Sequence, residues 1–153
     1  MTQSISGIDG KTKGAVREIV ERDEPVRMVN LAKEHGERLA EKKLKSSQIR
    51  SIFGTARAID GMWLIDNQKD RAFRELMKLK YKLAYQATRH KPKDAGDPHP
   101  MGDLAELLEP AIDAVGNADR GERQERFSRF LDFFEALLAY HRAFGGDNEG
   151  RDS

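Results

Sequence analysis

The sequence predicts an all-α protein, a compact bundle of about five helices with frayed polar termini. Apolar residues recur at three- and four-residue spacing through five segments, and no stretch alternates apolar and polar residues for long enough to form a strand. The 153 residues are enough for one hydrophobic core. We therefore expect a single helical-bundle domain over residues 23–144, between a flexible polar leader at 1–22 and a disordered tail at 145–153.

The first two helices follow the polar leader. One begins at Asp23, with a proline in its first turn where the missing N–H is harmless, and Gly36 weakens it. The second, expected over 46–66, begins with the N-cap pair Ser46-Ser47. Its apolar positions keep helical spacing and are Ile49, Ile52, Phe53, Ala56, Ile59 and Trp63.

The other three helices lie on either side of a break in the chain. The third covers about residues 69–90 and ends in the loop KPKDAGDPHP, whose prolines forbid regular structure. Pro110 should kink or split the fourth helix. The fifth, expected over 122–144, has the strongest apolar stripe and stops at a glycine pair. The polar side of the fourth helix carries four carboxylates, Asp103, Glu106, Glu109 and Asp113.

Composition excludes several classes of protein. The chain has no cysteine, which excludes disulfide frameworks, thiolate metal sites and cysteine nucleophiles. No apolar stretch approaches the roughly 20 residues that a membrane span needs, and the N-terminus lacks the apolar region of a signal peptide. We therefore expect a cytoplasmic protein with no membrane partner.

The four histidines form no recognisable catalytic or metal-binding motif. His141 falls in the apolar stripe of the fifth helix, where a core histidine is the simpler interpretation, and His35 has no ligand partner at helical spacing. His90 and His99 flank an acidic loop that could gather a metal but is more simply a solvated loop. Because motifs for nucleotide binding, zinc hydrolysis and serine nucleophiles are also missing, we expect no catalytic residue, no metal and no cofactor.

Charge is distributed unevenly along the chain. The totals nearly cancel, with 27 Lys and Arg against 26 Asp and Glu, but residues 69–93 carry nine basic and two acidic groups, and 94–125 carry two basic and nine acidic. On the third helix, six residues fall within an arc of roughly 80° opposite the apolar face. We call them the cationic ridge, and they are Arg71, Arg74, Lys78, Lys82, Tyr85 and Arg89.

The cationic ridge has more than one interpretation. Its five cations repel each other by a few tenths of a kcal/mol per pair, and Asp70 and Glu75 are too few to neutralise them. The phosphate backbone of a nucleic acid would supply counter-charges without regard to sequence, and Tyr85 could stack on a base or sugar. Alternatively, the ridge is an ordinary solvated face, or it pairs with an acidic protein surface and the chain is a helical adaptor.

Further cations lie beside the ridge. Lys80 falls in the middle of the apolar face of the third helix, so it must reach solvent, pair with an acid or line a groove. Lys43, Arg50 and Arg57 recur at seven-residue spacing along one edge of the second helix. If the second and third helices are neighbours, this line and the ridge could flank one groove, and all of these residues are candidates for nucleic-acid binding.

The fifth helix has a second, aromatic side. Phe133, Tyr140 and Phe144 lie on a flank displaced by roughly 90° from the main apolar stripe. Two interpretations stay open. Either this flank or the acidic side of the fourth helix docks a neighbouring subunit, or the aromatics complete a wide core beneath the first helix.

Three stretches of the chain are distinctive in their order and separation. They are L-K-S-S-Q-I-R at 44–50, L-K-Y-K-L-A-Y-Q-A-T-R at 79–89 and F-F-E-A-L-L-A-Y-H-R-A-F at 133–144. Together they resemble the small subunit of the type III-A CRISPR effector, the Csm complex. The leader and the KPKDAGDPHP loop depart from the family pattern.

The resemblance implies a non-catalytic helical bundle in antiviral defence. Its partners would be the crRNA and target RNA, the backbone and large subunits of the type III-A complex, and neighbouring copies of itself lined up along the RNA duplex. The basic positions that match the family's stretches are Arg50, Lys80, Lys82 and Arg89. In such complexes, catalysis belongs to the other subunits.

Overall fold

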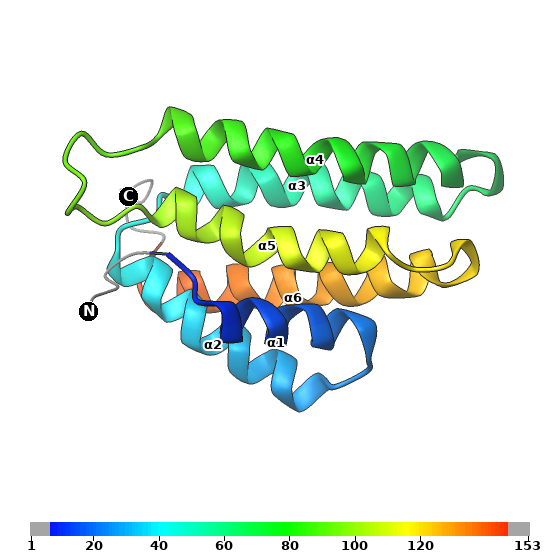
Figure 1. Ribbon diagram of the computed structural model, residues 1–153, viewed down its shortest axis with the longest axis horizontal. Coiled ribbons are helices and arrows are strands. Elements are labelled where there is room, and N and C mark those ends of the chain that lie inside the picture. Colours follow the sequence, from blue (N-terminus) through cyan, green and yellow to red (C-terminus); the bar gives the residue numbers. More distant parts are fainter. Residues whose placement is uncertain (1–6, 147–153) are drawn as a thin grey trace.

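The computed structural model describes residues 7–146, and in this range the chain is helical without any strand (Figure 1). Residues 1–6 of the expected leader and 147–153 of the expected tail lie outside the described residues. Two short 3₁₀ turns, η1 (Asp66–Gln68) and η2 (Arg120–Glu122), precede α4 and α6. The α-helices are α1 (Gly10–Glu21), α2 (Pro25–Glu41), α3 (Ser46–Trp63), α4 (Lys69–Arg89), α5 (Pro100–Gly116) and α6 (Arg123–Ala143).

Helix α6 lies at the centre of the bundle. It packs against α1, α2, α3 and α5, while α4 packs against α3 and α5 on the outside. Figure 1 shows α3 and α4 on one side of the α5–α6 pair and α1 and α2 on the other. These neighbours cover one wide apolar face of α6, which carries its buried phenylalanines, while the opposite side, with Glu125, Asp132 and Glu135, is exposed. The fully buried phenylalanines are Phe127, Phe130, Phe133 and Phe134.

Aromatic contacts fasten α3 to α6. The Trp63 indole stacks on the Phe127 ring at a centroid distance of 4.9 Å, and Phe53 meets Phe134 edge-on at 5.2 Å. Both are favoured aromatic arrangements and add to the hydrophobic stabilisation from burial. The position of α3, and of the α4 helix that packs on it, therefore depends on the α6 core.

Helix α1 corrects the expectation of a flexible leader over residues 1–22. The Asp9 carboxylate caps the helix by accepting from the Thr12 N–H at 2.8 Å. Val16, Ile19 and Val20 are buried against the other helices. Its apolar stripe is narrow and its first turns hold two glycines, so the sequence pattern is weak. The packing surface that stabilises this helix comes from distant parts of the chain.

The longest predicted helices are confirmed. The ranges 46–66, 69–90 and 122–144 correspond to α3, α4 and α6, with ends that agree to within three residues. The bundle holds six α-helices in the described range, one more than the five expected, because α1 is added. Helix α5 is not split at Pro110. The proline removes one backbone hydrogen bond, and packing against α1, α4 and α6 holds the helix together.

The structure favours the core interpretation of the aromatic flank on α6. Phe133 is fully buried and Tyr140 packs against the core cluster beneath α2. Phe144 stays 41% exposed and stacks on Tyr140 at 6.4 Å. Of the three residues proposed to dock a neighbour, only Phe144 therefore offers much of its ring to solvent.

Two carboxylates on the acidic side of α5 form contacts within the fold, which weakens the interpretation that this side docks a neighbouring subunit. The buried Asp103 carboxylate accepts from Lys42 Nζ at 2.5 Å and from the Gly7 N–H at 3.1 Å. Glu106 accepts from the Ile8 N–H at 2.8 Å. Because these carboxylates bind the segment before α1 and the end of α2, they hold the bundle together instead of forming a free docking surface.

Gly36 sets the distance between α2 and α6. A Cβ atom added at this residue would lie 2.7 Å from Tyr140 Cβ and 3.1 Å from the His141 nitrogen and the Leu137 oxygen of the α6 backbone. No side-chain movement can relieve contact with a backbone. The glycine that weakens the helix in the sequence pattern is thus what lets α2 approach α6.

Gly36→Ala should lower the free energy of unfolding by about 1–3 kcal/mol, because the added methyl group overpacks this contact. Gly54→Ala in α3 is the matched control. A Cβ there meets nothing within 4 Å, so the higher helix propensity of alanine should stabilise the protein by up to about 1 kcal/mol. Urea unfolding of both variants measures the difference, and equal effects would contradict the close packing of α2 on α6.

Candidate nucleic-acid interface

A groove of about 640 Å³ runs between α3 and α4. Its floor is apolar and includes Ile52, Leu79, Leu83 and Met101. Its rim carries hydroxyl and amide groups on the α3 side and tyrosines with one lysine on the α4 side. The rim residues are Ser47, Gln48, Ser51, Thr55, Tyr81, Lys82, Tyr85 and Gln86.

The cationic ridge follows the exposed face of α4 beside this groove. Arg74, Lys82 and Arg89 are exposed and form no ion pair within the described part of the chain. Lys78 pairs with Glu75 at 3.2 Å on the same helix, and Arg71 donates to the Gln68 side chain at 3.5 Å. Three cations on one face of a single helix are therefore left to interact with an external anion.

Two exposed tyrosines lie among the ridge cations. Tyr85, expected on the ridge, is 62% exposed, and Tyr81, which is not among the six ridge residues, is 61% exposed. The two rings stand one helical turn apart at the rim of the groove. The four-residue spacing was present in the sequence and could have identified Tyr81. An aromatic surface interleaved with cations suits the stacking of unpaired bases.

The second line of cations does not flank the groove. Arg50 and Arg57 are exposed, but the groove is lined on the α3 side by uncharged residues. The Arg57 guanidinium lies 5.9 Å from the centre of the Phe53 ring, which packs against α6. At 100° per residue, both arginines are turned toward the far edge of α3. Only Lys82 and Tyr85 of the ten candidate residues line the groove.

Lys80 pairs with an acid, one of the three outcomes expected for it. Its ammonium lies 2.7 Å from the Asp113 carboxylate of α5, and its side chain is 41% exposed. The hydrogen bond to Asp113 raises the pKa of Lys80 above its usual value. This cation therefore joins α4 to α5, which sets it apart from the unpaired cations of the ridge.

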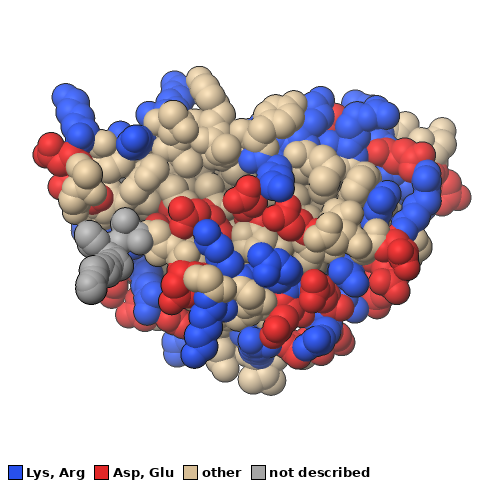
Figure 2. All heavy atoms as spheres, in the orientation of Figure 1, with Lys and Arg blue, Asp and Glu red and all other residues tan. Residues whose placement is uncertain are grey.

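Charge separates clearly on the face that α4 and α5 share. Figure 2 shows Lys and Arg gathered over the N-terminal half of α4 and a row of acidic side chains over α5.

The described residues hold no group of three or more His, Asp or Glu side chains that could ligate a metal ion. Among them, no helix is long and apolar enough to cross a membrane.

Lys43 has a backbone conformation that is unusual for lysine. Its φ is 70°, and it follows the C-cap of α2. The Leu44 N–H donates to the Leu39 carbonyl and the Lys43 N–H to the Ala40 carbonyl, each at 3.0 Å. This is a Schellman motif, in which glycine is the favoured residue at the left-handed position. The lysine side chain is exposed beside the start of α3.

Comparison with known protein families gives a match that covers most of the chain. A family model described as Csm2 Type III-A matches residues 22–147, which include α2 to α6. No curated protein and no solved structure shows a significant match to the chain.

Lys43→Gly should preserve or raise the free energy of unfolding, by up to about 1 kcal/mol, because glycine adopts the left-handed conformation without strain. Lys43→Val should lower it, since a β-branched side chain is strongly disfavoured at positive φ. Thermal unfolding of the two variants tests the cap. A glycine variant less stable than the valine variant would contradict this assignment.

Proposed function

We propose, from the premise that this chain belongs to the Csm2 type III-A family of CRISPR-associated defence proteins, that it is the RNA-contacting small subunit of a type III-A effector complex. In this proposal the subunit is non-catalytic and acts in the cytoplasm. Several copies line up along the crRNA–target RNA duplex, next to the backbone and large subunits. The α4 face contacts the RNA.

The observation that carries the RNA assignment is the set of unpaired cations on α4. Arg74, Lys82 and Arg89 have no acidic partner among the described residues, although acidic side chains are almost as numerous as basic ones in the chain. From Arg71 to Arg89 the ridge extends about 27 Å at a rise of 1.5 Å per residue. A linear polyanion has the length and the charge to cover such a ridge.

The side chains on this face favour recognition of the RNA backbone over recognition of its sequence. Lysine and arginine neutralise phosphates and release condensed counter-ions, which gives affinity that depends on salt. Tyr81 and Tyr85 can stack on any base, because every base has a π face. We therefore propose that binding does not depend on the guide sequence.

The triple variant Arg74/Lys82/Arg89→Ala should weaken RNA retention by the assembled complex and flatten its salt dependence by about one phosphate contact per residue. Its stability should change little, because exposed charges contribute little to folding. The matched control is Lys11/Arg17/Lys33→Ala, which removes three exposed cations from α1 and α2. Filter-binding titrations at several salt concentrations give both slopes.

A wild-type salt slope in the ridge variant would show that the ridge does not face RNA. If that variant also fails to join the complex while free RNA binding is unchanged, the ridge instead pairs with an acidic protein surface, and the chain is an adaptor.

Guide and target RNAs of unrelated but complementary sequence should be protected equally by the complex, since phosphates and base faces carry little sequence information. Nuclease footprints of several guide–target pairs, with and without the ridge substitutions, measure this. Protection by α4 that is present for one guide and missing for another would exclude backbone recognition.

A further inference from the structure

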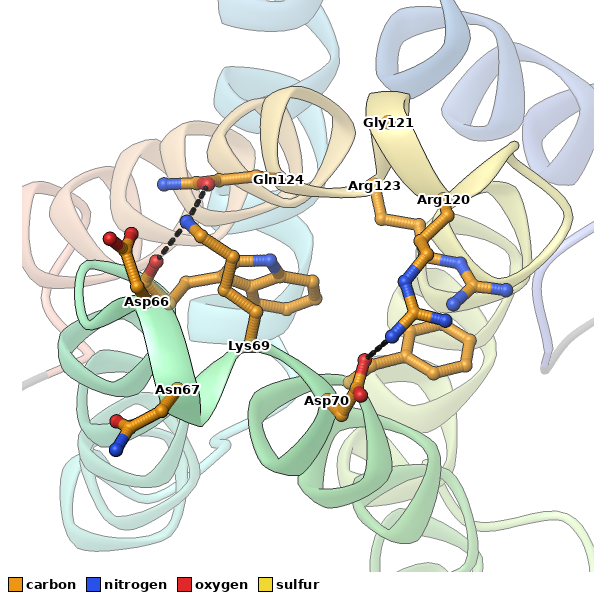
Figure 3. Close-up of a pocket in the computed structure, with 10 residues that line it drawn as sticks. Asp66, Asn67, Lys69, Asp70, Arg120, Gly121, Arg123 and Gln124 are labelled. Carbon is orange, nitrogen blue, oxygen red and sulfur yellow. Dashed lines mark hydrogen bonds and ion pairs between the residues drawn. The ribbon is translucent and has the colours of Figure 1, made fainter.

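A second cationic site lies at the end of the bundle where α4 and α6 begin. The turn between α3 and α4 and the turn between α5 and α6 enclose a pocket of about 480 Å³. Figure 3 shows side chains from both turns pointing toward one another across it. The pocket is lined by Lys69, Arg120 and Arg123, by the carboxylates Asp66 and Asp70, and by the rings of Trp63 and Phe73.

Two of these cations have no carboxylate partner. The Lys69 ammonium donates to the Trp63 carbonyl at 2.9 Å and to Gln124 Oε1 at 2.8 Å, both of them neutral acceptors, and retains a third N–H. The Arg123 guanidinium lies 3.8 Å from the centre of the Phe73 ring. Its Nε is buried without a hydrogen-bond partner in the described part of the chain. A buried donor without an acceptor is costly and favours a ligand that supplies one.

The third cation lies at the rim. Arg120 pairs with Asp70, and both side chains are largely exposed. Three cations against two carboxylates leave one positive charge in excess, which matches one phosphodiester or one other monovalent oxyanion. The indole of Trp63 is 3% exposed because it stacks on Phe127, so the pocket offers little aromatic surface to a base. The site therefore fits a compact oxyanion.

The place of the pocket on α4 indicates the source of that anion. Asp70 at the rim and Arg74 of the cationic ridge are four residues apart on α4, and so lie next to each other on its surface. An RNA strand that follows the ridge toward the start of α4 would bring its next phosphate to the pocket.

We propose that the pocket bounded by Lys69, Arg120 and Arg123 is a phosphate site, which takes a backbone phosphate of the RNA strand leaving the cationic ridge. The identity of the anion as RNA rests on the proposed function. The phosphate site itself rests on the arrangement of the three cations.

Trp63 provides a direct readout, because it is the only tryptophan of the chain and lines the pocket. Titration of the full chain with a short uridine oligonucleotide should change its emission. Arg123→Gln should raise the dissociation constant obtained from this titration about tenfold, as expected for a lost charge-assisted hydrogen bond. Arg17→Gln, which removes an exposed cation from α1, should leave the response unchanged.

Asp70→Asn is a second test, whose expected effect cannot come from loss of fold. This exposed residue contributes little to stability, and its substitution frees Arg120 and removes a repulsive carboxylate. The variant should therefore bind the oligonucleotide severalfold more tightly than the wild-type chain, a gain that misfolding cannot produce.

The outcomes separate this proposal from the proposed function. If RNA binds through the ridge while Trp63 emission stays constant and both pocket variants bind like the wild type, the phosphate site is wrong and RNA binding stands. If inorganic phosphate changes the emission in an Arg123-dependent way and RNA binds nowhere on the chain or complex, the RNA assignment is wrong. A response to a glutamate-rich peptide but not to RNA or phosphate overturns the proposal in favour of a protein carboxylate.

Discussion

The burial of the phenylalanine face of α6 is the constraint on which the rest of the bundle depends. This wide apolar face must be covered, and α1, α2, α3 and α5 provide that cover. His141 in its last turn is also buried, with Nε2 at 2.8 Å from the Leu44 carbonyl, which fixes the connection between α2 and α3. Helix α4 packs mainly on α3 and α5, so it keeps a wide solvent-facing side. The cationic ridge lies on that side.

Long-range ion pairs determine which charges remain available to a partner. Lys42 and Lys80 both pair with carboxylates of α5, so part of the acidic side of that helix is already paired within the fold. The ridge cations point away from α5, and among the described residues only Lys78 of this ridge pairs with a carboxylate, that of Glu75 on the same helix. The availability of charge on this surface therefore results from where α5 lies, and counting charges along the chain cannot reveal it.

Periodicity in the sequence predicted most of the fold, because strong apolar spacing in α3, α4 and α6 leaves few alternatives. The predicted helix at the start of the bundle corresponds to α2, but α1 was missed because its stripe consists of few apolar residues, and its stability comes from partners far along the chain. The exposed face of α4 could be predicted from helical periodicity alone. The position of Arg50 and Arg57 relative to the groove could not be predicted, because it depends on which side of α3 meets α4. The pocket between the two turns escaped prediction, since Lys69 and Gln124 lie 55 residues apart.

Helix α1 belongs to the unit that folds, but it lies outside the region of family likeness. The match begins at residue 22, directly after α1 ends, yet Val16, Ile19 and Val20 fill the core and Arg129 of α6 donates to the Val20 and Glu21 carbonyls. A shortened chain that starts where the likeness starts would expose the apolar surface of α5 and α6 and leave the Arg129 guanidinium without these acceptors. For recombinant expression, the chain should therefore begin upstream of Asp9. A boundary chosen from the family match, at residue 22, would remove α1.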